Sequence, residues 1–238
     1  ACLVGSEMCI ETDVNGVRLG TSSAIATDNV RITSTSGDIV LRGQANNQAS
    51  SAGVWVNAGA NISSSTGRVS ILGYSQRPTP TTNAHGVVLA NVGVAGVVSN
   101  ISSGASTGDA ITITGFVNSA TSSASSNANG VTIWPTNGGT QTINASGGGN
   151  IVITGTASSA TADGVELNYA NIYAAGGDIT VDAGSKNLEF NQSPGVATVR
   201  IGGSSSSSLA GDITLKSDSL TYIANGSTTF QNAAALYI

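Results

Sequence analysis

Residues 164–184 read GVELNYANIYAAGGDITVDAG, and the three short phrases in this stretch return in the same order along the chain. The first phrase has the form GV-x-L, the second centres on an Asn-Ile pair, and the third reads GDI-T-V. Successive copies follow one another at about thirty to forty-five residues, a period typical of solenoids and repeat arrays. The stretch therefore predicts a repeating architecture in which each unit contains three segments.

Six copies of the first phrase are visible, each followed by a middle phrase and a GDI-like phrase. The first phrase occurs as NGVRL from Asn15, AGVWV from Ala52, HGVVL from His85, NGVTI from Asn129, DGVEL from Asp163 and PGVATV from Pro194. The apolar residues of the middle phrase are Ile25, Ile62, Ile101, Ile143 and Ile172. The third phrase starts at Gly37, Gly67, Gly108, Gly149, Gly177 and Gly211.

Apolar residues alternate with other residues inside the phrases, as in Val165 and Leu167 or Ile179 and Val181. A period of two is typical of a β-strand with one buried face. Such short strands bury that face only when three of them form a coil and like phrases of successive coils pair in parallel. The predicted fold is all-β: a right-handed parallel β-helix, or β-solenoid, of about six coils and roughly 30 Å long.

This fold makes a specific prediction about the core, because the apolar residue that opens each third phrase stacks on its counterpart in the next coil. The predicted file is Ile39, Val69, Ile111, Ile151, Ile179 and Ile213. The glycine before each phrase is expected to supply a tight corner. Polar segments of different length follow the third phrase, which predicts side loops at one corner. We expect a single domain over residues 1–238, with 1–14 as an N-terminal cap or joint and 219–238 as the terminal coil.

The charge of the chain excludes several classes of partner. Charged residues make up only 9% of the sequence, against about 25% in ordinary soluble domains, and the net charge is -5. Nucleic acids and anionic membrane surfaces bind clustered positive charge, and the chain has no Lys/Arg run. The sequence also has no apolar stretch long enough for membrane insertion.

The sequence favours a protein that is not an enzyme. His85 is the single histidine and no G-x-S-x-G elbow accompanies the serines, so no catalytic residue is predicted. One histidine and two cysteines cannot complete a usual zinc sphere, so neither a metal nor a cofactor is expected.

Acidic residues recur directly after the glycine of the third phrase, at Asp38, Asp109, Asp178 and Asp212. Stacked carboxylates could bind Ca²⁺ or act as an acid and a base on a polysaccharide. Arg68 and Asn150 interrupt this column, so a role in the turn is the favoured interpretation. Asp178 and Asp212, the only stacked neighbours, carry the alternative of a polysaccharide-active site.

Cys2 and Cys9 lie close together at one end of the chain. A small disulfide loop is predicted, and two free buried thiols are the alternative.

Trp55 and Trp134 fall at positions whose side chains point away from the core of the first-phrase sheet. Such rings can stack on a glycan, contact a second subunit, or lie under a side loop, and the sequence does not separate these alternatives. Tyr169 and Tyr173 are expected to join the same surface.

The order of the phrases, together with the closing stretch GDITLKSDSLTYIANGSTTFQNAAALYI (211–238), resembles the repeat regions of filamentous-haemagglutinin-type bacterial exoproteins. The likeness covers nearly the whole chain. It implies a two-partner secreted protein on the surface of a Gram-negative cell, acting in adhesion, aggregation or biofilm formation. The chain lacks the Asn-Pro-rich secretion domain of that family, so we expect a segment or subunit of something longer.

We therefore expect a non-enzymatic extracellular module of a bacterial surface fibre or adhesin, whose partners are other copies of itself or surface glycans. A filament subunit that stacks head to tail is the first alternative, because the last residues, Ala235, Leu236, Tyr237 and Ile238, are apolar and leave an unpaired coil. A polysaccharide-active enzyme on the same scaffold is the second alternative.

Overall fold

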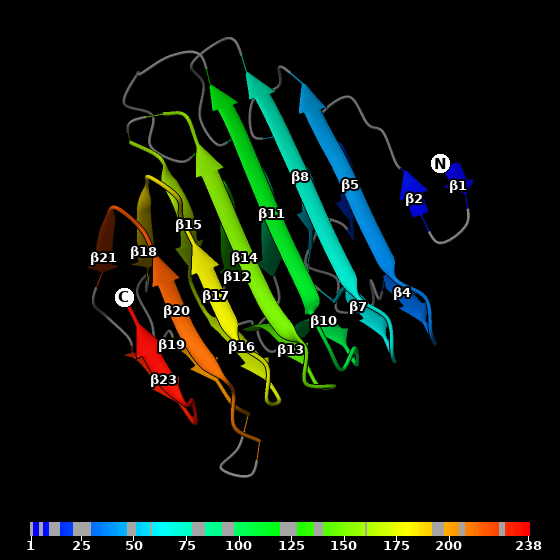
Figure 1. The fold of residues 1–238 in the computed structure, drawn as a ribbon. Helices are drawn as coiled ribbons and strands as arrows, with labels where there is room; N and C mark the ends of the chain where they lie inside the picture. The colour runs from blue at the N-terminus through cyan, green and yellow to red at the C-terminus, as the bar shows by residue number, and fades with distance from the viewer. Residues whose placement is uncertain are drawn as a thin grey trace.

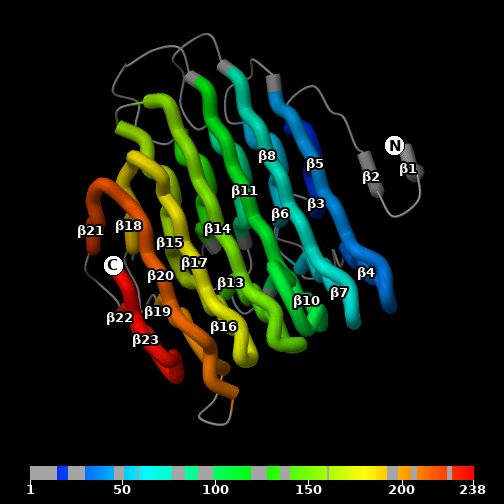
Figure 2. Tube along the Cα trace, in the orientation of Figure 1, coloured from blue at the N-terminus to red at the C-terminus, as the bar shows by residue number. Residues whose placement is uncertain are grey.

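The computed structural model shows strands that wind around one elongated core (Figures 1 and 2). It describes residues 2–4, 7–9, 15–20, 30–46, 51–57, 59–77, 84–91, 98–119, 128–135, 140–159, 161–191, 198–204, 208–223 and 227–238. Every regular element within these residues is a β-strand, and the strands form three sheets, here named A, B and C.

Sheet A contains nine strands and carries the third phrase of the repeat. Its order is β1-β2-β5-β8-β11-β14-β17-β20-β23, with β1 antiparallel to β2 and every other neighbouring pair parallel. The strands are β1 (Cys2–Val4), β2 (Glu7–Cys9), β5 (Ile39–Asn46), β8 (Val69–Arg77), β11 (Asp109–Ser119), β14 (Asn150–Ala157), β17 (Ile179–Asp182), β20 (Asp212–Lys216) and β23 (Ala235–Tyr237).

Sheets B and C contain seven parallel strands each and carry the first and second phrases. Sheet B consists of β3 (Val17–Leu19), β6 (Ala52–Val56), β9 (His85–Asn91), β12 (Val131–Pro135), β15 (Asp163–Leu167), β18 (Asn187–Asn191) and β21 (Ser219–Ile223). Sheet C consists of β4 (Arg31–Ser34), β7 (Asn61–Ser64), β10 (Val98–Ser103), β13 (Thr140–Ala145), β16 (Ala170–Ala174), β19 (Thr198–Gly202) and β22 (Ser227–Gln231).

The chain visits the sheets in a fixed cycle and advances by one strand spacing per turn. In Figure 1 the strands of sheet A run upward at the front, the chain returns behind them, and each later coil lies further left, which makes the solenoid right-handed. The predicted all-β right-handed parallel β-helix is therefore confirmed. Sheets B and C each have seven strands, so the solenoid has about seven coils instead of six.

The predicted core file is also confirmed. Cα register joins Ile39 to Val69, Val69 to Ile111, Ile111 to Ile151, Ile151 to Ile179 and Ile179 to Ile213, and the same file continues to Leu236. Its members from Ile39 to Ile213 are buried. Because adjacent strands lie about 4.8 Å apart, like side chains of successive coils contact one another directly. The repeat in the sequence is therefore a repeat of core contacts.

Two assignments within the repeat were wrong. In the first coil Ile32 of β4, and not Ile25, pairs with Ile62; Ile25 lies outside the described residues. The sheet B strand of the sixth coil is β18 with Leu188, and not the PGV phrase at Pro194, whose first four residues also lie outside the described part. The end of that phrase belongs to β19 in sheet C.

The glycine of the first phrase has a different role from the expected tight corner. Gly43, Gly73, Gly115 and Gly155 share one register position in sheet A and face the first-phrase glycines Gly16, Gly53, Gly86, Gly130 and Gly164 of sheet B. A Cβ on Gly115 would overlap the carbonyl oxygen of Gly130. The two sheets therefore touch backbone to backbone along this line. Beyond it lies a small second core of Ala84, Val117, Ala128, Ala157 and Ala162.

Connections vary most at two corners and less at the third, where only the connection from Gly202 to Asp212 is long. Between sheets A and B the longest connection runs from Ser119 to Val131, as the prediction of side loops after the third phrase requires. Between sheets B and C the connection varies too, from the long one between Leu19 and Arg31 to the short one between Leu167 and Ala170. The corner from sheet C to sheet A changes least, and it is where the acidic column lies.

Candidate functional site

The acidic column at the corner before sheet A holds neighbouring coils together. An Oδ1 atom at this position accepts a hydrogen bond from the backbone N–H of its counterpart in the next coil: Asp38 from Arg68 (2.7 Å), Asn150 from Asp178 (3.0 Å) and Asp178 from Asp212 (2.8 Å). The amide of Asn150 also donates to Asp109 (3.3 Å). This geometry agrees with the turn interpretation. The alternative of a polysaccharide site at Asp178 and Asp212 gains no support from it, because the Asp178 carboxylate is bound to the next corner.

The two tryptophans differ in their surroundings. The Trp55 indole donates to Asn57 Oδ1 (2.8 Å), lies 5.7 Å from the Arg18 guanidinium and packs beside Val88, so this ring is part of a small cluster on the outer face of sheet B. Trp134 lies two coils later and two residues further along the strand direction, and it is exposed. Of the two tryptophans, Trp134 is the one whose ring is open to a ligand or a second subunit.

Tyr169 and Tyr173 do not lie on the same face as the tryptophans. Tyr169 occupies the corner after β15 with a positive φ of 48°, and Tyr173 belongs to β16 in sheet C, in register with Asn144. The expected common aromatic surface is therefore not formed, because the chain turns from sheet B to sheet C between Leu167 and Ala170.

Cys2 and Cys9 lie opposite each other in the antiparallel pair of β1 and β2. Their side chains lie outside the described part, so the disulfide stays a prediction. The last strand, β23, contains Ala235, Leu236 and Tyr237, with Ile238 directly after it, and Leu236 pairs with Ile213 at the end of the core file.

A cluster that the sequence did not reveal lies on the outer face of sheet B. Glu166 of β15 and Glu189 of β18 are in direct register, and Asp163 begins the same strand as Glu166. Glu166 is buried, with Oε2 accepting from Asn129 Nδ2 (2.8 Å) and Oε1 from Asn191 Nδ2 (3.0 Å). Three carboxyl groups thus share one face of two adjacent strands.

The environment favours the neutral form of these carboxyl groups. Burial, followed by the charges of Glu189 and Asp163, raises the pKa of Glu166 to about 7, and the hydrogen bonds from Asn191 and Asn129 act in the opposite direction. Burial, followed by the charge of Asp163, raises the pKa of Glu189 to about 7. The pKa of Asp163 is raised by burial as well. The cluster is therefore partly protonated near neutral pH.

His85, on the same face two coils earlier, is buried and neutral. Burial lowers its pKa to about 4, and its Nδ1 lies 3.2 Å from the Thr132 hydroxyl. The ring is therefore a structural histidine in a polar contact.

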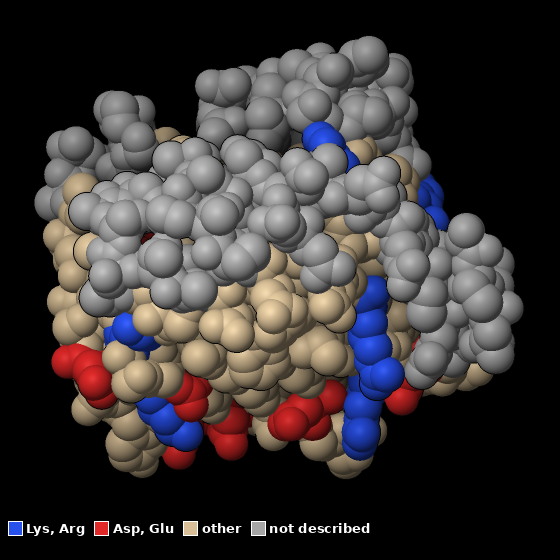
Figure 3. All heavy atoms as spheres, turned by 90° about the horizontal axis from the view of Figure 1, so that it is seen from above, with Lys and Arg blue, Asp and Glu red and all other residues tan. Residues whose placement is uncertain are grey.

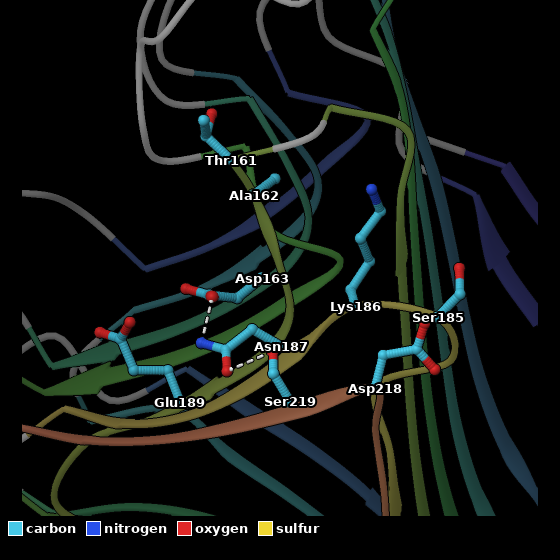
Figure 4. Close-up of a pocket in the computed structure, with 9 residues that line it drawn as sticks. All are labelled: Thr161, Ala162, Asp163, Ser185, Lys186, Asn187, Glu189, Asp218 and Ser219. Carbon is cyan, nitrogen blue, oxygen red and sulfur yellow. Dashed lines mark hydrogen bonds between the residues drawn. The ribbon is translucent and has the colours of Figure 1, made fainter.

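A cavity of about 390 Å³ adjoins the carboxyl cluster at the corner between sheets A and B. Its polar lining comes from Asp163, Asn187, Glu189, Asp218, Ser219 and neighbouring residues. Figure 4 shows the Asp163 and Glu189 carboxylates pointing to the same side, while the Lys186 chain points away from them. Asn187 donates to Asp163 Oδ1 (2.8 Å) and accepts from Ser219 (3.1 Å), and Lys186 Nζ donates to the Ser159 carbonyl (2.9 Å).

Charged residues are few in the chain as a whole, at 9% of the sequence. In Figure 3 most described side chains are uncharged, and Asp and Glu lie in small groups along one side. Among the described residues no set of three or more His, Cys, Asp or Glu side chains is arranged to hold a metal ion. The described part likewise has no helix that is long and apolar enough to span a membrane.

Comparison with known proteins adds no relative: no family model, no curated protein and no solved structure matches this chain.

Proposed function

We propose that the chain is a non-enzymatic structural module of an extracellular bacterial surface fibre, with adhesion as its second role. The proposal is carried by the hydrogen bonds that the side chains at the corner before sheet A make to the next coil. Asp38, Asn150 and Asp178 each bind the backbone of the next coil, so polar groups at this corner serve coil-to-coil cohesion. Together with the unbroken core file, they make a rod that resists local opening.

The resemblance to filamentous-haemagglutinin-type exoproteins supports a place on the surface of a Gram-negative cell. The low charge and the polar Ser, Thr and Asn surface suit a secreted fibre exposed to solvent. Immunogold labelling of intact source cells tests this location. Label on the outer surface before permeabilisation is the expected result, and label only after permeabilisation would contradict the proposal.

Mechanical unfolding tests the structural role. When the chain is pulled between its ends in an atomic force microscope, coils should detach one after another, each giving a step of one coil, from 23 residues between Ile213 and Leu236 to 42 between Val69 and Ile111. Asp178→Ala should lower the force of one step and leave the others unchanged. A chain that extends with no resolved step would rule out a load-bearing rod.

The adhesive role depends on Trp134, the exposed ring on the outer face of sheet B. Aromatic rings stack on the apolar faces of sugars and dominate many interfaces. A glycan array probed with the wild-type chain and with Trp134→Ala tests this role, with Trp55→Phe as a control on the covered ring. If Trp134→Ala leaves glycan binding unchanged, the adhesive site lies elsewhere on the surface.

A polysaccharide-active enzyme is the second candidate, and one observation favours it. Asp163 and Glu189 share a polar cavity and both have a raised pKa, the combination that acid–base catalysis uses. Digestion of neutral and uronate polysaccharides tests it. Cleavage that is lost in Glu189→Gln and kept in Asp178→Asn would establish the enzyme at this cavity, and no cleavage of any glycan would remove it.

A further inference from the structure

The outer face of sheet A is open and nearly free of charge in the central coils. In Figure 1 this face points toward the viewer across β5, β8, β11 and β14. Register places twelve outward side chains there in three rows: Val40, Ser70, Thr112 and Val152, then Arg42, Leu72, Thr114 and Thr154, then Gln44, Tyr74, Phe116 and Thr156. Each of these side chains is exposed or half-buried. Arg42, on the flanking strand β5, is the only charged residue of the twelve.

The apolar side chains of this face gather around its middle. Leu72 and Tyr74 lie two residues apart on β8, and Phe116 of β11 is in register with Tyr74. Phe116 is 37% exposed. Val40 and Val152 lie on the flanking strands β5 and β14. These five residues form an apolar patch with polar surroundings, which is typical of an interaction surface.

The patch is symmetrical about a line between β8 and β11. A two-fold axis along this line, parallel to the strands, exchanges β8 with β11 and β5 with β14, and it keeps each row at its own height. Tyr74 of one copy then opposes Phe116 of a second copy, and Val40 opposes Val152. Two sheets that pack face to face lie about 10 Å apart with their strands within about 30° of each other, so their side chains interdigitate.

The charges beside this face agree with the same axis. Directly before the first row, at the corner that precedes sheet A, Arg68 at β8 and Asp109 at β11 are both exposed. The axis exchanges these two positions, so each arginine faces an aspartate of the other copy. Asp38 faces the neutral Asn150 in the same way. Complementary charge at a rim favours this register over others.

The area of the face is sufficient for a specific contact. Four strands about 4.8 Å apart, each about eight residues long at about 3.3 Å per residue, cover roughly 20 Å by 26 Å. Two such faces bury roughly 1,000 Å² in total, which is at the lower limit for a specific interface. We therefore expect a reversible dimer that depends on protein concentration.

We propose that two copies of this chain associate side by side through the outer faces of their sheets A, with the two-fold axis between β8 and β11. Two-fold, self-complementary interfaces of this kind are the commonest among homo-oligomers. The face lies along the side of the solenoid and involves neither end. The inference rests on the proposed structural role and names the partner within the fibre as a second copy.

Sedimentation of the chain over a range of concentrations tests the pairing. The wild type should reach a dimer and grow no further. Phe116→Lys should weaken dimerisation at least tenfold, because it places a charge at the centre of the joint on each copy. Leu209→Lys is the matched control, since Leu209 is 55% exposed and lies outside the strands of sheet A. The control should dimerise like the wild type.

An exchange of the corner charges tests the axis. Arg68→Asp and Asp109→Arg should each weaken the dimer, because each variant places like charges opposite one another. The double variant restores opposite charges and should dimerise nearly as well as the wild type. Two single effects that simply add in the double variant would overturn the proposed axis.

Circular dichroism of the same samples separates this inference from the structural role. A monomer at every concentration that keeps its β-sheet spectrum would overturn the pairing and leave the structural role intact. Self-association that Phe116→Lys leaves unchanged would overturn the pairing as well, because the joint would lie elsewhere. A monomer that loses glycan binding in Phe116→Lys would overturn it in favour of a glycan on this face. A wild-type chain without a β-sheet spectrum would overturn both proposals.

Discussion

The two ends of this solenoid use the same repeat and differ in what lies beyond it. In the first coil Leu19 is 4% exposed, and sheet A continues past that coil into β2 and β1. In the last coil Leu220, an inward position of sheet B in the neighbouring file, which starts at Val17, is 45% exposed. The residue type is the same, so the exposure is set by the neighbouring coil and not by the sequence of the strand.

This difference shows that each coil depends on two neighbours for its stability. A central strand such as β11 contacts β8 on one side and β14 on the other, and its isoleucines are buried. The last strand of sheet B, β21, pairs only with β18 within the described chain, and its inward Leu220 and Tyr222 are each 45% exposed. Within the described chain, the inward side chains are therefore buried in the central coils and at β3, and about half exposed at β21.

The largest expected effect compares one leucine at each end. Leu19→Ala should lower the free energy of unfolding by about 2–4 kcal/mol, because it empties a buried position. Leu220→Ala should cost less than about 1 kcal/mol in dilute solution, because that side chain is half in solvent already. Urea unfolding followed by circular dichroism measures both. Equal costs for the two variants in dilute solution would show that the two ends do not differ in burial.

A smaller effect comes from the carboxyl cluster of β15 and β18. The folded-state pKa of Glu189 is about 7, above its usual 4.5. The protonated carboxyl group of Glu189 therefore contributes fully to the stability of the fold below pH 4.5, and this contribution is lost as the pH rises through 7. Glu189→Gln removes this pH-dependent loss of stability, and it also removes the repulsion between the charges of Glu189 and Glu166. The variant should be more stable than the wild type by about 1 kcal/mol at pH 8, since the site is partly screened by solvent, and nearly equal at pH 4.

Unfolding curves at pH 4, 6 and 8 check this prediction. His85 acts in the opposite direction, since its lowered pKa of about 4 gives stability that is lost as the pH falls below 6.5. Its contribution cancels in the difference between the variant and the wild type. A difference that does not change with pH would show that Glu189 has its ordinary pKa.

The smallest effect concerns a single corner contact. Asp178→Ala removes the acceptor for the Asp212 N–H and should cost about 1 kcal/mol. Asp218→Ala, which removes the same charge from an exposed position between β20 and β21, is the control and should be nearly neutral. Equal effects of the two variants would mean that charge, and not the hydrogen bond between coils, is what Asp178 contributes.

The architecture could be predicted because stacking copies one pattern into every coil. Alternation in the third phrase determines which residues face inward. The glycine that precedes each phrase shows where the alternation begins, so Ile111 and Ile151 could be aligned from the sequence alone. The choice between Ile25 and Ile32 could not be made, since both lie in similar Ile-containing phrases and only pairing with Ile62 separates them.

The sixth coil and the carboxyl cluster were missed for a related reason. Gly164 of sheet B faces Ala183 of sheet A, where the earlier coils have a glycine. The line of touching glycines therefore ends at this point. The next strand of sheet B, β18, forms from NLEFN without a Gly-Val phrase. Without that strand, Glu189 had no known neighbour. Glu166 and Glu189 become a pair only through the register of β15 with β18, which spacing in the sequence does not reveal.

The distance between two spin labels tests the stacked architecture most directly. Val40 and Thr214 occupy the same outward row of sheet A, five strand spacings apart, which predicts roughly 24 Å between their backbones. In a background with Cys2 and Cys9 replaced by serine, labels at these positions should give one narrow distribution near that distance. A broad distribution, or one centred beyond about 40 Å, would contradict the solenoid.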